Sequence, residues 1–141
     1  MKDVSLDIAK GQTLGLVGES GSGKSSLARA LLRLDETESG IIRFKGRDIT
    51  RLGGLDLQKL RKSIQVVLQD PFSALNPRKV VRSSIAEGPI IHGMPKAQAY
   101  ARAEELLELT GLSTNAGMRY PHEFSGGQRQ RICIARALAL E

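Results

Sequence analysis

A glycine-rich stretch near the start of the chain has the residue types needed to hold phosphate groups. It reads Gly-Glu-Ser-Gly-Ser-Gly-Lys-Ser over residues 18–25. Glycines let the backbone turn tightly with no side chain in the way, so that successive N–H groups can point at phosphate oxygens. Lys24 would reach the β- and γ-phosphates, and the Ser25 hydroxyl would take one place around Mg²⁺. The pattern predicts a P-loop that binds a nucleoside triphosphate.

The elements on either side of this stretch are the ones that a P-loop needs. The apolar run 13–17 precedes it and predicts a strand, and residues 26–32 have helical spacing without a breaker. The start of that helix would add unpaired amides and the positive end of the helix dipole. A flexible Gly/Ser loop would not require these neighbours. The residues expected to bind the nucleotide are Gly18, Glu19, Ser20, Gly21, Ser22, Gly23, Lys24, Ser25 and Ser26.

Two further segments carry polar groups that could serve the same chemistry. Gln69 follows the β-branched, apolar run 64–68, which suits a buried parallel strand. An amide at the carboxyl end of such a strand lies where open α/β sheets bind ligands, but a plain loop glutamine fits as well. Ser-Gly-Gly-Gln at 125–128 precedes a helical stretch. It could be a second phosphate site or an ordinary helix cap.

Hydrophobic patterning predicts an α/β core that carries a helical insert. Strands are expected at 4–8, 13–17, 41–44 and 64–68, and a short helix at 55–61. The clearest helix of the insert lies between Pro95, which suits a first turn, and Gly111, which suits a C-terminal cap. Its apolar side chains share one face, and its glutamates lie largely opposite. The apolar face comprises Tyr100, Ala103, Leu106, Leu107 and Thr110.

Composition narrows the classes of protein that remain. A chain of 141 residues has room for one domain, and its single cysteine, Cys133, excludes an intrachain disulfide and suits a small buried position. The net charge of +6 comes from Lys and Arg mixed with acidic residues, and aromatics are only 4%. Nucleic-acid binders more often concentrate basic residues between stacking aromatics, so no nucleic-acid partner is expected. No uncharged run approaches the ~20 residues of a membrane helix.

The motifs together resemble those of the ATP-binding cassette (ABC) family. Phe-Ser-Gly-Gly-Gln-Arg-Gln-Arg at 124–131 is similar to the family signature, with Phe124 in place of the usual leucine, and Gln69 falls where the family's Q-loop falls. The segments 69–78 and 120–122 further resemble the ATP-binding subunits of oligopeptide and dipeptide importers. The resemblance covers essentially the whole chain.

The resemblance implies a P-loop NTPase fold with a small β subdomain and a helical subdomain. It also implies a second ABC ATPase subunit facing the first head to tail, so that ATP on one P-loop is covered by the partner's signature. The residues that would cover it are Ser125, Gly126, Gly127 and Gln128. Gln69 would help to position Mg²⁺ and the attacking water, and would signal through the helical insert to membrane-spanning permease subunits.

One part of the family pattern is not found. No run of four apolar residues ends in Asp-Glu, so the Walker B carboxylates are missing, and both His92 and His122 precede the signature, whereas the family's switch histidine follows it. The chain is therefore expected to be a partial domain that stops before the Walker B strand. In the family, that strand and the next lie between the strands expected at 13–17 and 64–68. Without them, these two strands would lack partners.

The expected function is that of an ATP-hydrolysing subunit of a di- or oligopeptide importer, peripheral on the cytoplasmic face of the membrane. The chain by itself should bind nucleotide with Mg²⁺ but hydrolyse it negligibly. Two alternatives are a non-hydrolysing half-cassette partner and a DNA-associated cassette ATPase. The expected division is a P-loop core and β subdomain at 1–73, a helical subdomain at 74–124, and the signature with its helix at 125–141.

Overall fold

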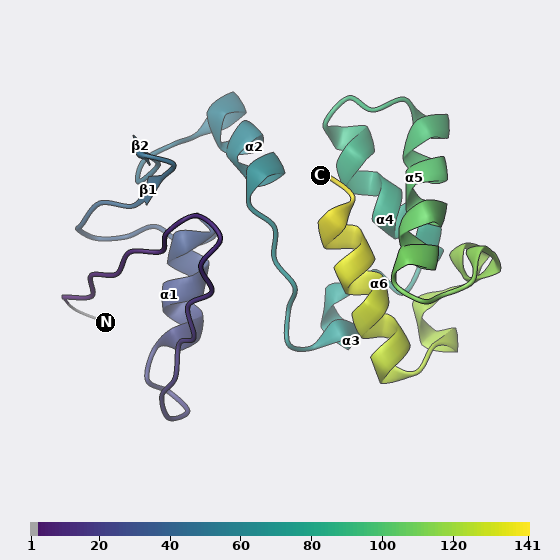
Figure 1. Ribbon diagram of the computed structural model, residues 1–141, viewed down its shortest axis with the longest axis horizontal. Coiled ribbons are helices and arrows are strands. Elements are labelled where there is room, and N and C mark those ends of the chain that lie inside the picture. The colour runs from purple at the N-terminus through teal and green to yellow at the C-terminus, as the bar shows by residue number, and fades with distance from the viewer. Residues whose placement is uncertain (1–2) are drawn as a thin grey trace. The chain divides into compact units, whose positions relative to one another are not determined.

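The computed structural model describes residues 3–141, and the chain forms two compact units, residues up to 57 and residues 58–141. Each unit is described by itself. The elements run in the order α1 (Lys24–Leu31), β1 (Arg43–Phe44), β2 (Arg47–Asp48), α2 (Gly54–Ser63), α3 (Pro71–Ala74), α4 (Val81–Ile91), α5 (Lys96–Leu109), η1 (Thr114–Met118), η2 (Pro121–Glu123) and α6 (Gly126–Leu138) (Figure 1). Helix α2 contains the boundary between the units.

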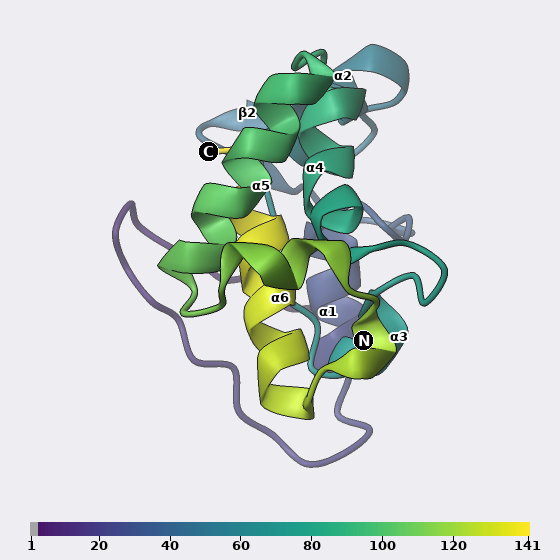
Figure 2. The same ribbon diagram turned by 90° about the vertical axis from the view of Figure 1, so that its right-hand side faces the viewer.

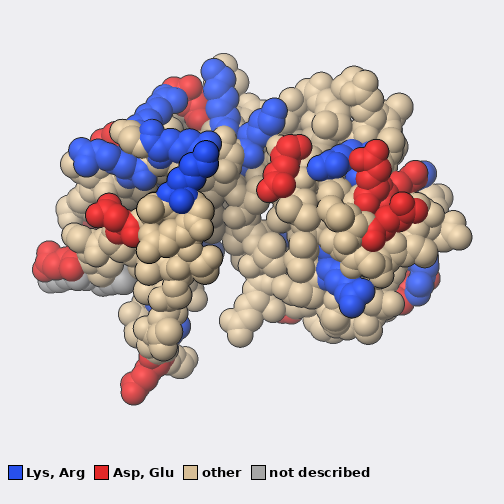
Figure 3. All heavy atoms as spheres, viewed as in Figure 1, with Lys and Arg blue, Asp and Glu red and all other residues tan. Residues whose placement is uncertain are grey.

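The N-terminal unit consists of helix α1, the hairpin of β1 and β2, and long irregular segments. The hairpin is antiparallel, with Arg43 opposite Asp48 and Phe44 opposite Arg47. Basic side chains gather over this unit on the face drawn in Figure 3. Two basic residues of this unit lie near acids: Arg47 pairs with Asp56 at 2.9 Å, and Arg43 lies opposite Asp48 in the hairpin. The pKa of Asp48 lies below its usual range mainly because Thr50 donates hydrogen bonds to its carboxylate, and the charge of Arg43 adds a smaller effect.

Three of the four expected strands are not formed, so these predictions are wrong. Within residues 3–141 the segments 4–8, 13–17 and 64–68 form no strand, and the expected strand 41–44 is reduced to β1. The cause is the absence of a pairing strand among the described residues, because an extended segment becomes a strand only when a neighbour completes its hydrogen bonds. The expectation that 13–17 and 64–68 would lack partners is confirmed.

The C-terminal unit is a helical assembly built on α4, α5 and α6, which pack against one another (Figures 1 and 2). The short elements close the sides of this core, since η1 packs on α4 and α5, and α3 packs on α6. Cys133, as expected, is a buried core residue. The other buried residues of the core are Leu75, Val81, Ile85, Ala86, Ala99, Ala103, Leu106, Leu107, Ala116, Phe124, Ile132, Ala135 and Ala139.

Helix α5 confirms the expected helix of the insert. Pro95 stands one position before the helix, as its N-cap, and the chain leaves the helix through Gly111 at a φ of 76°. The amide of Leu112 donates to the carbonyl of Leu107 and the amide of Gly111 to that of Glu108, which is the Schellman arrangement that favours glycine at this position. Leu112 also packs against the core. The helix expected at 55–61 is confirmed as α2.

Candidate nucleotide site

The P-loop segment forms a tight turn that leads directly into α1. Gly21 and Gly23 adopt φ angles of 84° and 95°, a region that side chains other than glycine strain to reach, and Gly23 is the N-cap of the helix. A side chain at Gly18 would place its Cβ 2.9 Å from the Ser22 hydroxyl oxygen. Gly21 and Gly23 are therefore required by the shape of the loop itself, whereas a side chain at Gly18 would displace the Ser22 hydroxyl.

The side chain of Lys24 folds back over this loop. Its ammonium group donates to the carbonyl oxygens of Gly18 and Glu19, each at 2.6 Å, and to the Ser22 hydroxyl at 3.2 Å. The loop thus holds a positive charge beside the N-terminal end of α1, where the free amides and the helix dipole add further positive potential. Such an arrangement can bind an anion with several oxygens, such as a polyphosphate chain.

The oxygen atoms near the loop limit how a metal could be held there. Ser25 stands in the first turn of α1 and is exposed, so its hydroxyl is accessible. Among the described residues, no group of three or more His, Cys, Asp or Glu side chains could hold a metal ion. The Ser25 hydroxyl could supply one oxygen to a Mg²⁺ ion that keeps most of its own water. Such sparse protein ligation is usual for Mg²⁺ bound with a nucleotide.

Gln69 lies in the C-terminal unit, directly before the short helix α3, and is exposed. The next residue, Asp70, caps α3 by accepting hydrogen bonds from the amides of Phe72 at 2.9 Å and Ser73 at 3.3 Å. Hydrogen bonds from these two residues stabilise the ionised carboxylate and so hold the pKa of Asp70 below its usual range. The bond from the Phe72 amide has the largest effect. These two hydrogen bonds therefore hold Asp70, and with it the backbone directly after Gln69, against the start of α3.

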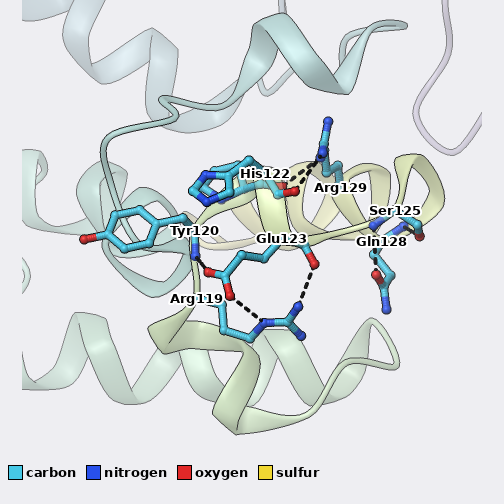
Figure 4. Close-up of polar contacts among 8 residues, drawn as sticks. Arg119, Tyr120, His122, Glu123, Ser125, Gln128 and Arg129 are labelled. Carbon is cyan, nitrogen blue, oxygen red and sulfur yellow. Dashed lines mark hydrogen bonds and ion pairs between the residues drawn. The ribbon is translucent and has the colours of Figure 1, made fainter.

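The segment expected to carry the family signature begins helix α6. Ser125 is the N-cap: its hydroxyl accepts from the Gln128 amide at 3.3 Å, and the Gln128 side-chain oxygen accepts from the Ser125 amide at 3.0 Å (Figure 4). This reciprocal pair is a capping box. A Cβ atom added at Gly126 or Gly127 would meet nothing within 4 Å. The helix start therefore presents bare backbone to its surroundings.

The turn before α6 is held by a small polar network, drawn in Figure 4. Glu123 accepts from the Tyr120 amide at 2.6 Å and from the Arg119 side chain at 3.4 Å, while Arg119 also donates to the Glu123 carbonyl at 2.6 Å. The bond from Tyr120 is the main reason that the pKa of Glu123 lies below its usual range. Phe124, only 4% exposed, joins the core as the apolar anchor of the segment.

Sequence reasoning did not single out two arginines of α6 that contact these segments. Arg129 lies over the ring of Phe72, with 3.8 Å between its Cζ atom and the ring centroid, and Arg136 donates to the carbonyl of Ala74. Side chains on a helix point back toward the preceding turn, and Arg129 stands one turn after Ser125. Its position in the sequence could therefore have indicated that its side chain lies near the start of α6. The P-loop belongs to the N-terminal unit, and Gln69 and residues 125–128 to the C-terminal unit.

Comparison with known proteins gives one consistent result. The family model described as ABC transporter matches residues 1–141. The glutathione import ATP-binding protein GsiA of Escherichia coli strain K12 is 55% identical over 141 residues, which are 99% of this chain and 23% of that protein. GsiA of Shigella flexneri gives the same values. The chain therefore spans about a quarter of the length of these curated relatives.

Two solved structures are similar in fold. The dimeric post-hydrolysis state of the ATP-binding cassette MJ0796, bound to ADP and Pi, matches with a TM-score of 0.81 and 29% identity, over 95% of this chain and 59% of that one. The structure of cbiO1 from Clostridium perfringens, part of the ABC transporter complex cbiONQ, matches with a TM-score of 0.73 and 29% identity. That match covers 88% of this chain and 48% of the other.

Proposed function

Because this chain belongs to the ABC transporter family, we propose that it forms the nucleotide-binding part of an ATPase subunit that powers an importer. The observation that carries the proposal is the closure of the loop 18–22 around the Lys24 ammonium group beside the start of α1. In this role Lys24 exchanges its bonds to loop carbonyls for bonds to the β- and γ-phosphates of ATP. The loop amides of residues 18–26 bind the remaining phosphate oxygens.

Ser25 and Gln69 are the residues that we propose as ligands of Mg²⁺. Bound there with the nucleotide, the ion would neutralise charge on the phosphates. The exposed hydroxyl of Ser25 supplies one oxygen, and the side-chain amide of Gln69 supplies a second that also orients water. Neutral oxygens suit a hard cation that keeps most of its own water. Ser25 and Gln69 would only bind Mg²⁺ and orient water, so catalysis also requires a carboxylate that accepts a proton from the water. We therefore propose that the chain by itself binds ATP but hydrolyses it negligibly.

The start of α6 is the surface that we propose meets the nucleotide of a second ATPase subunit. Ser125 and Gln128 offer polar side chains there, and Gly126 and Gly127 leave the backbone open for close approach. The positive end of the α6 dipole favours a phosphate at this position. A head-to-tail dimer would thus complete each site from two chains. The dimeric state of the MJ0796 structure supports the dimer, and the head-to-tail arrangement is part of the proposal.

The transported solute that we propose is a short peptide or a peptide-like molecule. GsiA is named for glutathione import, and its 55% identity to this chain is the support. No described helix is long and apolar enough to cross a membrane. We propose that the subunit works with permease subunits that span the membrane and binds at their cytoplasmic side. The inclusion of cbiO1 in a transporter complex is consistent with such an assembly.

The test is nucleotide binding by the full native polypeptide and its Lys24→Ala variant. Since a hydrogen bond between charged groups is lost, the affinity for ATP should fall about tenfold or more. The affinity for AMP, which lacks the β- and γ-phosphates, should stay within about twofold. Lys10→Ala, which removes an exposed lysine of the same unit, is the matched control. Equal loss of ATP and AMP binding, or no loss of ATP binding, would contradict the proposed site.

A further inference from the structure

The guanidinium group of Arg129, a residue of α6, contacts both the turn before this helix and helix α3. Its Nε atom donates to the carbonyl of Pro121 at 2.8 Å, and a terminal nitrogen donates to that of His122 at 3.4 Å (Figure 4). The face of the same group covers the ring of Phe72 at 3.8 Å. The backbone amide of Arg129 donates to the carbonyl of Ser125 at 2.9 Å. One residue therefore contacts the cap of α6, the turn before it and helix α3.

Arginine has the chemistry for this junction, whereas lysine does not. A planar guanidinium can stack on an aromatic ring with its face while its edge donates hydrogen bonds in fixed directions. Phe72 is 63% exposed, so its ring is held by this cation more than by the apolar core. An ammonium group in the same place could keep the charge but could not make both kinds of contact at once.

A second tie fixes the other end of α3. Arg136, about two turns further along α6, donates to the carbonyl of Ala74, which is the last residue of α3. At the first end, Asp70 caps the helix through the amides of Phe72 and Ser73. Helix α3 is attached to α6 by the contact of Phe72 with Arg129 and by the bond from Arg136 to Ala74, and Gln69 directly precedes its cap.

From these contacts we infer that Arg129 is a positioning residue that holds Gln69 in a fixed relation to Ser125. The inference rests on the proposed function, in which Gln69 serves the nucleotide of its own P-loop and Ser125 meets that of the partner subunit. A rigid connection between them makes the two nucleotide sites of a dimer act together, since movement at one residue is passed to the other through α6. Nucleotide binding by one P-loop does not require this connection, but hydrolysis in the dimer does.

The experiment compares variants of the full native polypeptide by kcat, KM for ATP and Kd for ATP. Arg129→Gln and Phe72→Leu should each lower kcat about tenfold, a typical size for coupling between sites, and leave KM and Kd within about twofold. Phe72→Tyr, which keeps the ring, should retain at least about half of the wild-type kcat. The double variant should be no slower than the slower single one, because both changes break the same contact. Arg102→Gln, which removes an ion pair with Glu105 on α5, is the control.

Three results would overturn the inference. They are an Arg129→Gln variant with the kcat of the Arg102→Gln control, a Phe72→Tyr variant as slow as Phe72→Leu, and a double variant whose losses multiply. A purely structural role would instead lower the folded fraction, which active-site titration with nucleotide corrects for. Failure of the proposed function gives a different result, namely a Lys24→Ala variant that hydrolyses ATP as fast as the wild type.

Discussion

Ser125 allows the stability of α6 and its proposed contact with phosphate to be separated. Its hydroxyl accepts one hydrogen bond, from the Gln128 amide, and the reciprocal bond from the Ser125 amide to the Gln128 side chain does not involve the hydroxyl. Ser125→Ala therefore removes one capping bond. Ser125→Asp keeps an acceptor at the N-cap, where aspartate caps as well as serine and its charge suits the helix dipole.

The two variants should change stability and activity in opposite ways. Loss of an N-cap acceptor costs about 1 kcal/mol, so the Gln128 amide in Ser125→Ala should exchange its hydrogen about fivefold faster. Ser125→Asp should exchange at about the wild-type rate or slower. If Ser125 meets the phosphates of the partner's ATP, however, the new carboxylate repels them. The better-capped variant should then be the less active one, with ATP hydrolysis close to background.

The assay uses the full native polypeptide with its partner subunits, and measures hydrogen exchange at residues 125–131, ATP hydrolysis and ATP affinity. Each P-loop should bind ATP with unchanged affinity in both variants, since Ser125 belongs to the site of the other subunit. Ser125→Asp with wild-type hydrolysis would refute the proposed contact with phosphate. Ser125→Ala with unchanged exchange at Gln128 would refute the capping argument.

Two further predictions concern the C-terminal unit. Ile132 is fully buried, so Ile132→Ala should lower the free energy of unfolding by about 2–5 kcal/mol in urea denaturation, whereas Ile134→Ala, at a side chain 38% exposed, should cost about 1 kcal/mol or less. The pKa of Glu123 is lower when folded, so its stabilising effect should be present above the unfolded value of 4.5 and be lost as the pH falls through the folded value. Glu123→Gln should remove that part of the pH dependence.

Each of these predictions has an outcome that contradicts it. Equal losses of stability in Ile132→Ala and Ile134→Ala would mean that the packing of α6 differs from the structure. An unfolding midpoint with the same acid dependence in Glu123→Gln as in the wild type would show that the bonds from Tyr120 and Arg119 do not set the pKa of Glu123.

The features that the sequence predicted well depend on neighbours close in the chain. Helix α5 follows from its apolar face and from Gly111 at its end, and the P-loop turn follows from glycines within six residues of one another. The capping box joins residues only three apart. Each of these depends on local spacing and backbone conformation, which a sequence displays directly.

The features that the sequence predicted poorly depend on distant partners. The run 64–68 has the composition of a buried strand, yet its side chains Val66, Val67 and Leu68 are 38–43% exposed and no ladder forms. Composition shows that a segment could pair, but pairing needs a second strand at the right place. The contacts of Arg129 with Phe72 and of Arg136 with Ala74 span 57 and 62 residues. No periodicity within one segment could have identified such pairs.

The glycines of the two candidate phosphate-binding segments are required for different reasons. Gly21 and Gly23 have positive φ angles, so the P-loop needs them for its own conformation. Gly126 and Gly127 lie within α6 and have open space around them, so the chain's own packing does not require them. A glycine in a helix interior costs about 1 kcal/mol relative to alanine, and Gly127 stands in the first turn of α6, so Gly127→Ala should stabilise the helix by up to about that amount.

The same change should lower activity if the bare backbone at Gly127 is what meets the partner's nucleotide. A methyl group there would stand between the helix start and a phosphate, so ATP hydrolysis by the dimer should fall while each P-loop binds ATP as before. Slower hydrogen exchange in α6 together with slower hydrolysis would exclude unfolding as the cause. A Gly127→Ala polypeptide that is more stable and fully active would show instead that no ligand approaches this backbone closely.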